Sequence, residues 1–229
     1  MKIYFIRHGD PDYRHDCLTE LGHKQAQAAA ERLKHSEIER VYSSTCGRAF
    51  QTAEYTANKL GLEVIPCEFM TELGWKSIDG EPIVSNGNPW EITDSFISEG
   101  KPLTDENWFE KEPFSRSIVV GRGRSAFEKF DELLSELGYK REGYYYRVTS
   151  EEVCKNIAMF SHGGSSTAVL AHLLNIPFPQ ICGLFRMNCA SVIILELSCK
   201  VGELVAPKLL LFNDTKHNEG LETEIVFGN

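Results

Sequence analysis

Two short apolar runs in this chain each end abruptly on a histidine followed by glycine. Residues 2–6 (KIYFI) lead into Arg7-His8-Gly9, and residues 157–161 (IAMFS) lead into His162-Gly163-Gly164. Runs of this kind predict buried strands, and in open α/β sheets ligands bind at the carboxyl ends of the strands. The two strand ends therefore predict one composite site, built from residues far apart in the sequence.

Strand and helix patterns alternate along most of the chain. Helical spacing of apolar residues predicts helices over residues 21–33, 48–60, 127–137 and 165–174, and short apolar runs predict strands over residues 2–6, 41–43, 62–66 and 156–161. Residues 191–197 and 204–212 predict an antiparallel hairpin at the sheet edge. We expect a single α/β domain over residues 1–229, a three-layer α/β/α sandwich with a mostly parallel sheet and one antiparallel edge strand.

The periodicity fails between residues 75 and 115. This stretch contains several glycines and prolines, together with Trp90, Trp108 and Phe109. A loop of this length in a compact domain is either a lid or a segment with its own small core. We therefore expect an irregular cap insertion with short helices. Its aromatic side chains either stack on a bound substrate or fill the core of the insertion, and the second alternative is favoured.

Composition excludes several classes of function. The formal net charge is −9, so broad binding to nucleic acid or to anionic membranes is not expected. No apolar run approaches the ~20 residues that span a bilayer, and no signal peptide fits the first residues. The seven cysteines are scattered without a C-x-x-C pair, which favours reduced thiols in a cytoplasmic protein. The histidine spacing offers no zinc site, and we expect neither a metal nor a cofactor.

Four residues at the predicted strand ends and helix starts could hold an anion and attack it. Arg7 and His8 follow the first strand, Arg48 begins a helix, and His162 precedes another helix. The planar guanidinium group matches phosphate oxygens two at a time, and free amides at a helix N-terminus favour negative charge. An imidazole beside two guanidinium groups should have a lowered pKa and be neutral, and a neutral ring nitrogen is a competent nucleophile. These residues suggest a phosphohistidine intermediate and a small phosphorylated substrate.

Four motifs, in this order, carry a resemblance to a known family. They are Arg7-His8-Gly9, residues 18–22 (LTELG) with Gln25-Ala26, residues 43–53 (SSTCGRAFQTA), and Ser161-His162-Gly163-Gly164. Together they resemble the histidine phosphatase superfamily, which includes the cofactor-dependent phosphoglycerate mutases and many phosphomonoesterases. The resemblance covers residues 1–73 and 155–197 and leaves the insertion uncovered.

The resemblance implies a role for each matching residue. His8 would be the nucleophile, and Arg7, Arg48 and His162 would line the phosphate pocket, with His162 also donating to the phosphate during catalysis. The family's proton donor is usually an acidic residue after the third strand, and residues 70–75 (MTELGW) match that pattern. This makes Glu72 the candidate general acid, with Asp79 and Glu81 as competing candidates.

The chain departs from the family after the first motif, where residues 10–14 read DPDYR in place of the usual threonine and asparagine. The Glu-Arg-His-Tyr-Gly stretch typical of the mutase branch is absent around Glu72. We therefore expect a metal-independent phosphomonoester hydrolase. A phosphoglycerate-type mutase and a non-catalytic phosphate-binding protein are the alternatives. The sequence leaves the physiological substrate and the oligomeric state open.

Overall fold

A six-stranded sheet forms the centre of the molecule. The computed structural model describes residues 1–151 and 156–221. The strands lie in the order β11-β9-β1-β8-β4-β5. Their bounds are β1 (Lys2–Arg7), β4 (Ile38–Ser43), β5 (Val64–Pro66), β8 (Asn156–Ser161), β9 (Val192–Glu196) and β11 (Lys208–Asp214). Strands β1, β8, β4 and β5 run parallel, as the sequence predicts.

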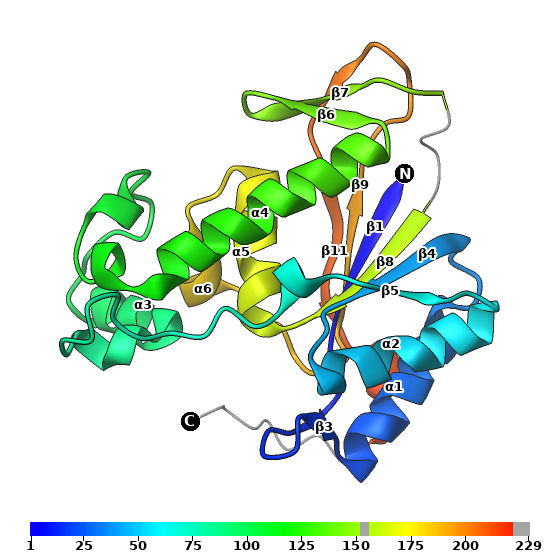
Figure 1. Ribbon diagram of the computed structural model, residues 1–229, viewed down its shortest axis with the longest axis horizontal. Coiled ribbons are helices and arrows are strands. Elements are labelled where there is room, and N and C mark those ends of the chain that lie inside the picture. The colour runs from blue at the N-terminus through cyan, green and yellow to red at the C-terminus, as the bar shows by residue number, and fades with distance from the viewer. Residues whose placement is uncertain (152–155, 222–229) are drawn as a thin grey trace.

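The predicted antiparallel hairpin exists, but its position differs in detail. Strand β9 is antiparallel to both β1 and β11, so it lies one place in from the edge and β11 forms the edge itself. The second apolar run divides into two strands, because β10 (Leu204–Val205) pairs with a different sheet. That small sheet also contains β6 (Tyr139–Glu142) and β7 (Tyr145–Val148), which form the hairpin at the top of Figure 1.

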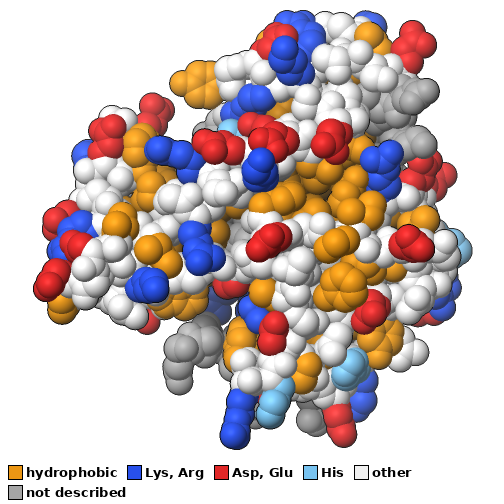
Figure 2. All heavy atoms as spheres, viewed as in Figure 1, with side chains coloured by type: hydrophobic (Ala, Val, Ile, Leu, Met, Phe, Trp, Pro, Cys, Tyr) orange, Lys and Arg blue, Asp and Glu red, His pale blue; other side chains and the backbone are white. Residues whose placement is uncertain are grey.

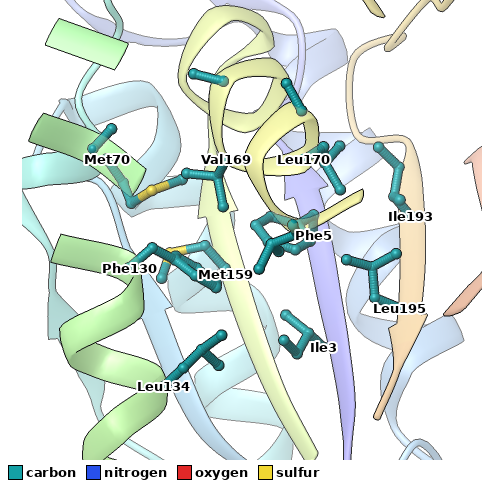
Figure 3. Packing of buried hydrophobic residues seen from close by; sticks show 14 of the residues in the cluster. Ile3, Phe5, Met70, Phe130, Leu134, Met159, Val169, Leu170, Ile193 and Leu195 are labelled. Carbon is teal, nitrogen blue, oxygen red and sulfur yellow. The ribbon is translucent and has the colours of Figure 1, made fainter. Parts of the chain in front are cut away.

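Helices cover both faces of the sheet, which confirms the three-layer fold. Alternate side chains of a strand point to opposite faces. Ile3 and Phe5 therefore pack toward α4 (Ile118–Glu136) and α5 (Gly163–Leu174), and Phe5 stacks on Phe130 with ring centroids 5.5 Å apart (Figure 3). Tyr4 and Ile6 pack on the other face, in the core that also contains residues of α1 (Glu20–Leu33) and α2 (Gly47–Leu60).

Local signals set several helix ends. The Thr19 hydroxyl accepts a hydrogen bond from the Gly22 amide at the start of α1, and Gly61 ends α2 with a φ of 68°. Helix α4 begins at Ile118, nine residues before the predicted start, and the Ser117 side chain caps it. Its first turns contain two glycines and no clear apolar stripe, so periodicity alone missed them.

The insertion at residues 75–115 forms the lobe on the left of Figure 1. It contains short helices, as expected: η2 (Val84–Gly87), α3 (Pro89–Ser98), η3 (Trp108–Glu110) and η4 (Phe114–Arg116). Trp108 packs edge-on against Phe114 and stacks on Phe178 of α6 (Phe178–Leu184), with centroids 5.3 Å apart in the second pair. The insertion is thus packed against the end of the main fold as well as on itself.

The remaining elements connect these layers. They are β2 (Pro11–Asp12), β3 (Cys17–Leu18), η1 (Glu68–Met70) and η5 (Lys216–Asn218).

Figure 2 shows acidic and basic side chains mixed over the left lobe and α4, with apolar side chains gathered between α4 and α2. Among the helices of the described ranges, none combines the length and apolar character that a bilayer crossing requires.

Close backbone contacts fix the loop that follows β1. A Cβ atom on Gly22 would lie 2.2 Å from the Asp10 carbonyl oxygen, so only glycine lets α1 approach this loop. We predict that Gly22→Ala lowers the free energy of unfolding by about 1–3 kcal/mol, the usual cost of overpacking. Urea unfolding measures this change.

Gly121→Ala is the matched control, because Gly121 lies in α4 and a Cβ there would meet no atom within 4 Å. Alanine is the better helix former, so this variant should be as stable as the parent or up to about 1 kcal/mol more stable. Equal effects of the two substitutions would contradict the close contact at Gly22.

Candidate active site

The pairing of β1 with β8 brings the two predicted histidines together. Arg7 is opposite Ser161 in the parallel register, so His8 and His162 each follow the last pair. The His8 amide donates to the Ser161 carbonyl over 2.9 Å, and the two imidazole centroids are 5.2 Å apart. Both side chains are buried, with exposed fractions of 1% and 0%. The fold therefore brings the two strand ends together, as the sequence analysis expects.

The His8 ring is held in one tautomer. Its Nδ1 lies 2.7 Å from the Gly9 carbonyl oxygen, which can only accept, so Nδ1 carries the proton and Nε2 keeps its lone pair. Burial and the positive charge of Arg7 hold the pKa of His8 well below its usual value, with His162 and Arg48 adding to the effect. His8 thus has a neutral ring whose Nε2 keeps its lone pair.

The His162 ring is oriented by a serine that the sequence analysis did not single out. Ser44 Oγ lies 2.8 Å from His162 Nε2 and also accepts a hydrogen bond from the Cys46 amide, which leaves the hydroxyl proton free to donate to a lone pair on Nε2. Nδ1 then carries the ring proton, and this buried atom has no partner in the described part of the chain. Burial and the charges of Arg48 and Arg7 lower the pKa of His162 to about 3. His162 is therefore a neutral hydrogen-bond donor.

Both predicted arginines lie beside the histidines, and each is fixed by one end of its guanidinium group. Arg7 Nη1 donates to the Met187 carbonyl over 2.5 Å, and Arg48 Nη1 forms an ion pair with Asp16. The Nε atoms of both arginines are buried without a partner among the residues described. His162 Nδ1 is a third buried donor without a partner in the described residues, and both guanidinium groups lie close enough to act on the charge of this ring. Buried donors are normally paired, so these groups suit an anionic ligand.

Asp16 is a second residue that sequence reasoning missed. Its carboxylate accepts the Gly47 amide over 2.7 Å at the start of α2 and also pairs with Arg48, which fixes that guanidinium group at the pocket. Two other carboxylates of this segment, those of Asp10 and Asp12, are bound by Thr19 and His15. No local pattern links Asp16 to Arg48, because the contact joins a hairpin tip to a distant helix.

Tyr13 stands at the mouth of the site, on the same hairpin as Asp16. The Arg48 guanidinium carbon lies 5.2 Å from the centre of the Tyr13 ring, a cation–π distance. The ring meets His8 edge-on with centroids 6.4 Å apart, and 55% of Tyr13 is exposed. The Tyr13 side chain therefore lies beside His8, on the side of the imidazole that is nearer to solvent.

Glu72 lies at the N-terminus of α5, the helix that His162 precedes. Its Oε1 accepts the amides of Leu73 and Ser165, over 2.9 and 3.2 Å. A Cβ on Gly164 would come within 2.4 Å of the same oxygen, so glycine is needed for this approach. The competing candidates lie elsewhere on the surface: Asp79 is bound by Arg116, and Glu81 is exposed. The geometry therefore favours Glu72 over both.

Trp90 of the insertion also packs on the start of α5. A Cβ built on Gly163 would lie 3.8 Å from the Trp90 ring and 3.9 Å from Arg7 Nε. Trp75 meets Trp90 edge-on, with centroids 5.5 Å apart. The sequence analysis favoured a purely internal role for the aromatic residues of the insertion. Trp90 instead borders the site, next to Arg7 and Glu72.

Metal-binding side chains do not gather at this site. Within residues 1–151 and 156–221, no three His, Cys, Asp or Glu side chains form a group that could hold a metal ion. The polar groups that do gather are donors and cations, which suit an anionic ligand.

Comparison with known proteins identifies relatives of this fold and site. A model of the histidine phosphatase superfamily (branch 1) matches residues 3–208. A probable phosphoglycerate mutase, GpmB, of Yersinia pestis (strain Pestoides F) is 25% identical over 199 residues, which cover 83% of this chain and 82% of that protein.

Solved structures give the same picture of the fold. The native structure of a mycobacterial glucosyl-3-phosphoglycerate phosphatase matches with a TM-score of 0.62 at 25% identity, over 93% of this chain and 98% of the other. A phosphoserine phosphatase from Entamoeba histolytica, in complex with 3-phosphoglyceric acid, matches with a TM-score of 0.60 at 20% identity, over 94% and 98%. The second similarity shows the fold alone.

Both imidazoles should stay neutral in mildly acidic solution. Burial and nearby guanidinium groups disfavour the charged ring, so the pKa values of His8 and His162 move down. We predict that ring nitrogen resonances of both residues still report the neutral Nδ1–H form at pH 6.5, where an ordinary imidazole is half protonated. Ring-edited nitrogen NMR on the free protein measures this, and a midpoint at or above pH 6.5 for either residue would contradict the assignment.

Removing the Ser44 hydroxyl should weaken anion binding. Without this hydroxyl, no serine proton is donated to Nε2 of His162, and the ring proton can move from Nδ1 to Nε2. Nδ1 would then be an acceptor and could not donate to an anion. We predict that Ser44→Ala weakens binding of inorganic phosphate by about tenfold, the value of one hydrogen bond to a charged group.

Ser43→Ala is the matched control. Ser43 is the preceding buried serine, and its hydroxyl donates to the Ser44 carbonyl rather than to the ring. Titration calorimetry should give it the affinity of the parent protein. Equal losses in the two variants would show that Ser44 acts through local packing and not through the His162 tautomer.

Proposed function

The chain belongs to the histidine phosphatase superfamily (branch 1), and we propose that it hydrolyses phosphate monoesters of a small metabolite through a phosphohistidine at His8. The observation that carries this proposal is the set of three buried, unpartnered donors around the neutral His8 ring. Arg7 Nε, Arg48 Nε and His162 Nδ1 would each reach an oxygen of one phosphate group. The similarity to a glucosyl-3-phosphoglycerate phosphatase supports hydrolysis.

In the first step the His8 Nε2 lone pair would attack phosphorus. The N–P bond forms as the bond to the ester oxygen breaks, and the leaving oxygen takes a proton from Glu72. The two guanidinium groups and the His162 N–H stabilise charge that develops on the equatorial oxygens, and because they are already in place they need no reorganisation. The Gly9 carbonyl keeps the proton on Nδ1 and lets the ring carry positive charge after attack.

In the second step water would release the phosphate. Glu72, now ionised, takes a proton from the attacking water, the new O–P bond forms, and the N–P bond breaks. The His8 lone pair returns and inorganic phosphate leaves. Every proton in this cycle is carried by Glu72, so the scheme assigns no step to a metal or cofactor. We therefore expect activity to survive chelation.

The leaving group would lie beside Glu72 and the indole of Trp90. Both side chains border the start of α5, and Trp90 also lies near Arg7. An aromatic wall at this place suits a leaving group with a flat or apolar face. The partner that this pocket fits is a small phosphorylated molecule rather than a nucleic acid or a membrane, in keeping with a net charge of −9 and a cytoplasmic setting.

The nucleophile and the acid can be tested separately. We predict that His8→Ala abolishes both turnover of p-nitrophenyl phosphate and base-stable labelling of the protein by a labelled phosphomonoester. His15→Ala is the matched control, because His15 lies on the neighbouring hairpin, is exposed and is paired with Asp12. Persistent labelling of the His8 variant would refute the proposed nucleophile.

For the acid, we predict that Glu72→Gln slows phosphoenzyme formation from an alkyl phosphate by about 10²–10⁴-fold. The loss should be much smaller with p-nitrophenyl phosphate, because its leaving group needs no proton. Single-turnover rapid quench measures this step, and Glu68→Gln in η1 serves as an exposed carboxylate control. Equal losses with both substrates would remove Glu72 from the acid role.

A phosphoglycerate mutase is the second candidate, because a probable mutase is 25% identical over most of the chain. The hydrolase assignment predicts that 3-phosphoglycerate with added bisphosphoglycerate gives no 2-phosphoglycerate. A coupled enolase assay measures the isomer, and a phosphate assay follows hydrolysis in the same samples. Isomer formation faster than phosphate release would select the mutase, and tight binding of phosphate esters without either product would select a non-catalytic protein.

A further inference from the structure

A second cavity lies away from the paired histidines. It has a volume of about 710 Å³ and is lined by α4, the carboxyl half of α5, the tip of the β6–β7 hairpin and residues 106–109 of the insertion. Figure 1 labels these helices and strands. None of Arg7, His8, Arg48, Glu72 and His162 lines it. Its volume falls within the usual range of small-molecule sites, about 300–1,000 Å³.

The interior of this cavity is mostly apolar. Small residues, Gly123 of α4 with Ala168 and Ala171 of α5, leave the space open, and Phe109 and Phe127 contribute aromatic surface. A Cβ on Gly123 would meet only the Ala168 methyl group, at 3.7 Å. The cavity therefore exists because the side chains that face it from the two packed helices are small. Its shape suits the flat or apolar body of a ligand.

The polar side chains of one wall are already satisfied. Arg141 donates to the Tyr146 hydroxyl over 2.8 Å and to Asn175 Oδ1 over 2.9 Å. His172 pairs with Asp131 over 2.8 Å and stacks on Phe127 with centroids 4.4 Å apart. These groups hold the hairpin against α5 and have little hydrogen-bonding capacity left for a ligand.

Arg124 is the exception. It lines the cavity from α4 with its guanidinium carbon 5.9 Å from the centre of the Phe109 ring, and it forms no ion pair or hydrogen bond with any residue that the structure describes. Glu106 also lines the cavity and would repel a second anionic group on a ligand. The cavity thus offers an apolar interior and one free cation on one rim.

We propose that this cavity is a binding site for a small monocarboxylate with an aromatic or similarly apolar body. The body lies against Phe109, Phe127 and the small residues of α4 and α5. The carboxylate pairs with the planar fork of Arg124, whose geometry matches two carboxylate oxygens. This site is separate from the phosphate pocket and does not depend on the reaction proposed for it.

The test is a titration of the full chain with 2-naphthoate, followed by backbone amide resonances. We expect saturable shifts at Gly123 and Ala171, with no comparable shifts at Gly9 and Gly163 of the phosphate pocket. Uncharged 2-naphthamide should bind about tenfold more weakly, because it lacks the charge that Arg124 pairs.

Two arginines of α4 supply the decisive variants. Arg124→Gln should weaken 2-naphthoate binding about tenfold and leave 2-naphthamide unchanged. Arg122→Gln, at an exposed arginine of the same helix that does not line the cavity, should alter neither. Gly123→Leu should block both ligands, and its thermal transition shows whether the fold is kept.

The proposal would be overturned by the absence of saturable shifts at Gly123 and Ala171, or by shifts centred on Gly9 and Gly163. Equal effects of the Arg122 and Arg124 variants would likewise overturn it, because the carboxylate would then respond to general surface charge. If Gly123→Leu fails to fold, the two arginine variants still decide the question.

Discussion

The parallel register of β1 and β8 is the constraint on which the site depends. Arg7 is opposite Ser161, so the residues that follow, His8 and His162, leave the sheet side by side. A shift by one residue would turn every side chain of β1 to the other face, so the alternating cores on the two sides of the sheet also fix the position of the histidines. Core packing and site geometry therefore depend on the same register. The apolar side chains of KIYFI fix how β1 pairs with β8, and this pairing fixes the position of the histidine that follows the strand.

Electrostatics explains how a chain with a net charge of −9 can keep a pocket suited to the proposed phosphate substrate. Two imidazoles and two guanidinium groups share a buried space, and four positive charges there would be too costly. Burial and mutual repulsion leave both imidazoles neutral, so the fixed charges are Arg7 and Arg48, and Asp16 partly balances Arg48. The result is a pocket with few charges but several preset donors, and such donors need little reorganisation as charge develops.

Much of this arrangement could be predicted from sequence, for identifiable reasons. Strand ends and helix starts are local signals, so Arg7, His8, Arg48 and His162 were found and the fold class followed from alternation. Ser44 and Asp16 were missed because their roles exist only through contacts across the fold, with His162 and Arg48. Glu72 was found through the family pattern alone, since a loop carboxylate carries no local signal. Trp90 was assigned to the insertion's own core, and only the packing on Gly163 and Gly164 shows that it borders the site.

Helix α5 contributes residues to both sites, one near each end of the helix. Its first turn follows His162 and carries Gly163 and Gly164, against which Trp90 and Glu72 pack, while Ala168 and Ala171 further along line the second cavity. Its 12 residues span about 18 Å, and nine of them are buried, so the helix is a rigid spacer. Different parts of the insertion also contribute to the two sites. Trp90 contacts one end of this helix, and residues 106–109 lie near the other end. We therefore expect substitutions on the Arg124 side to leave the groups around His8 in place.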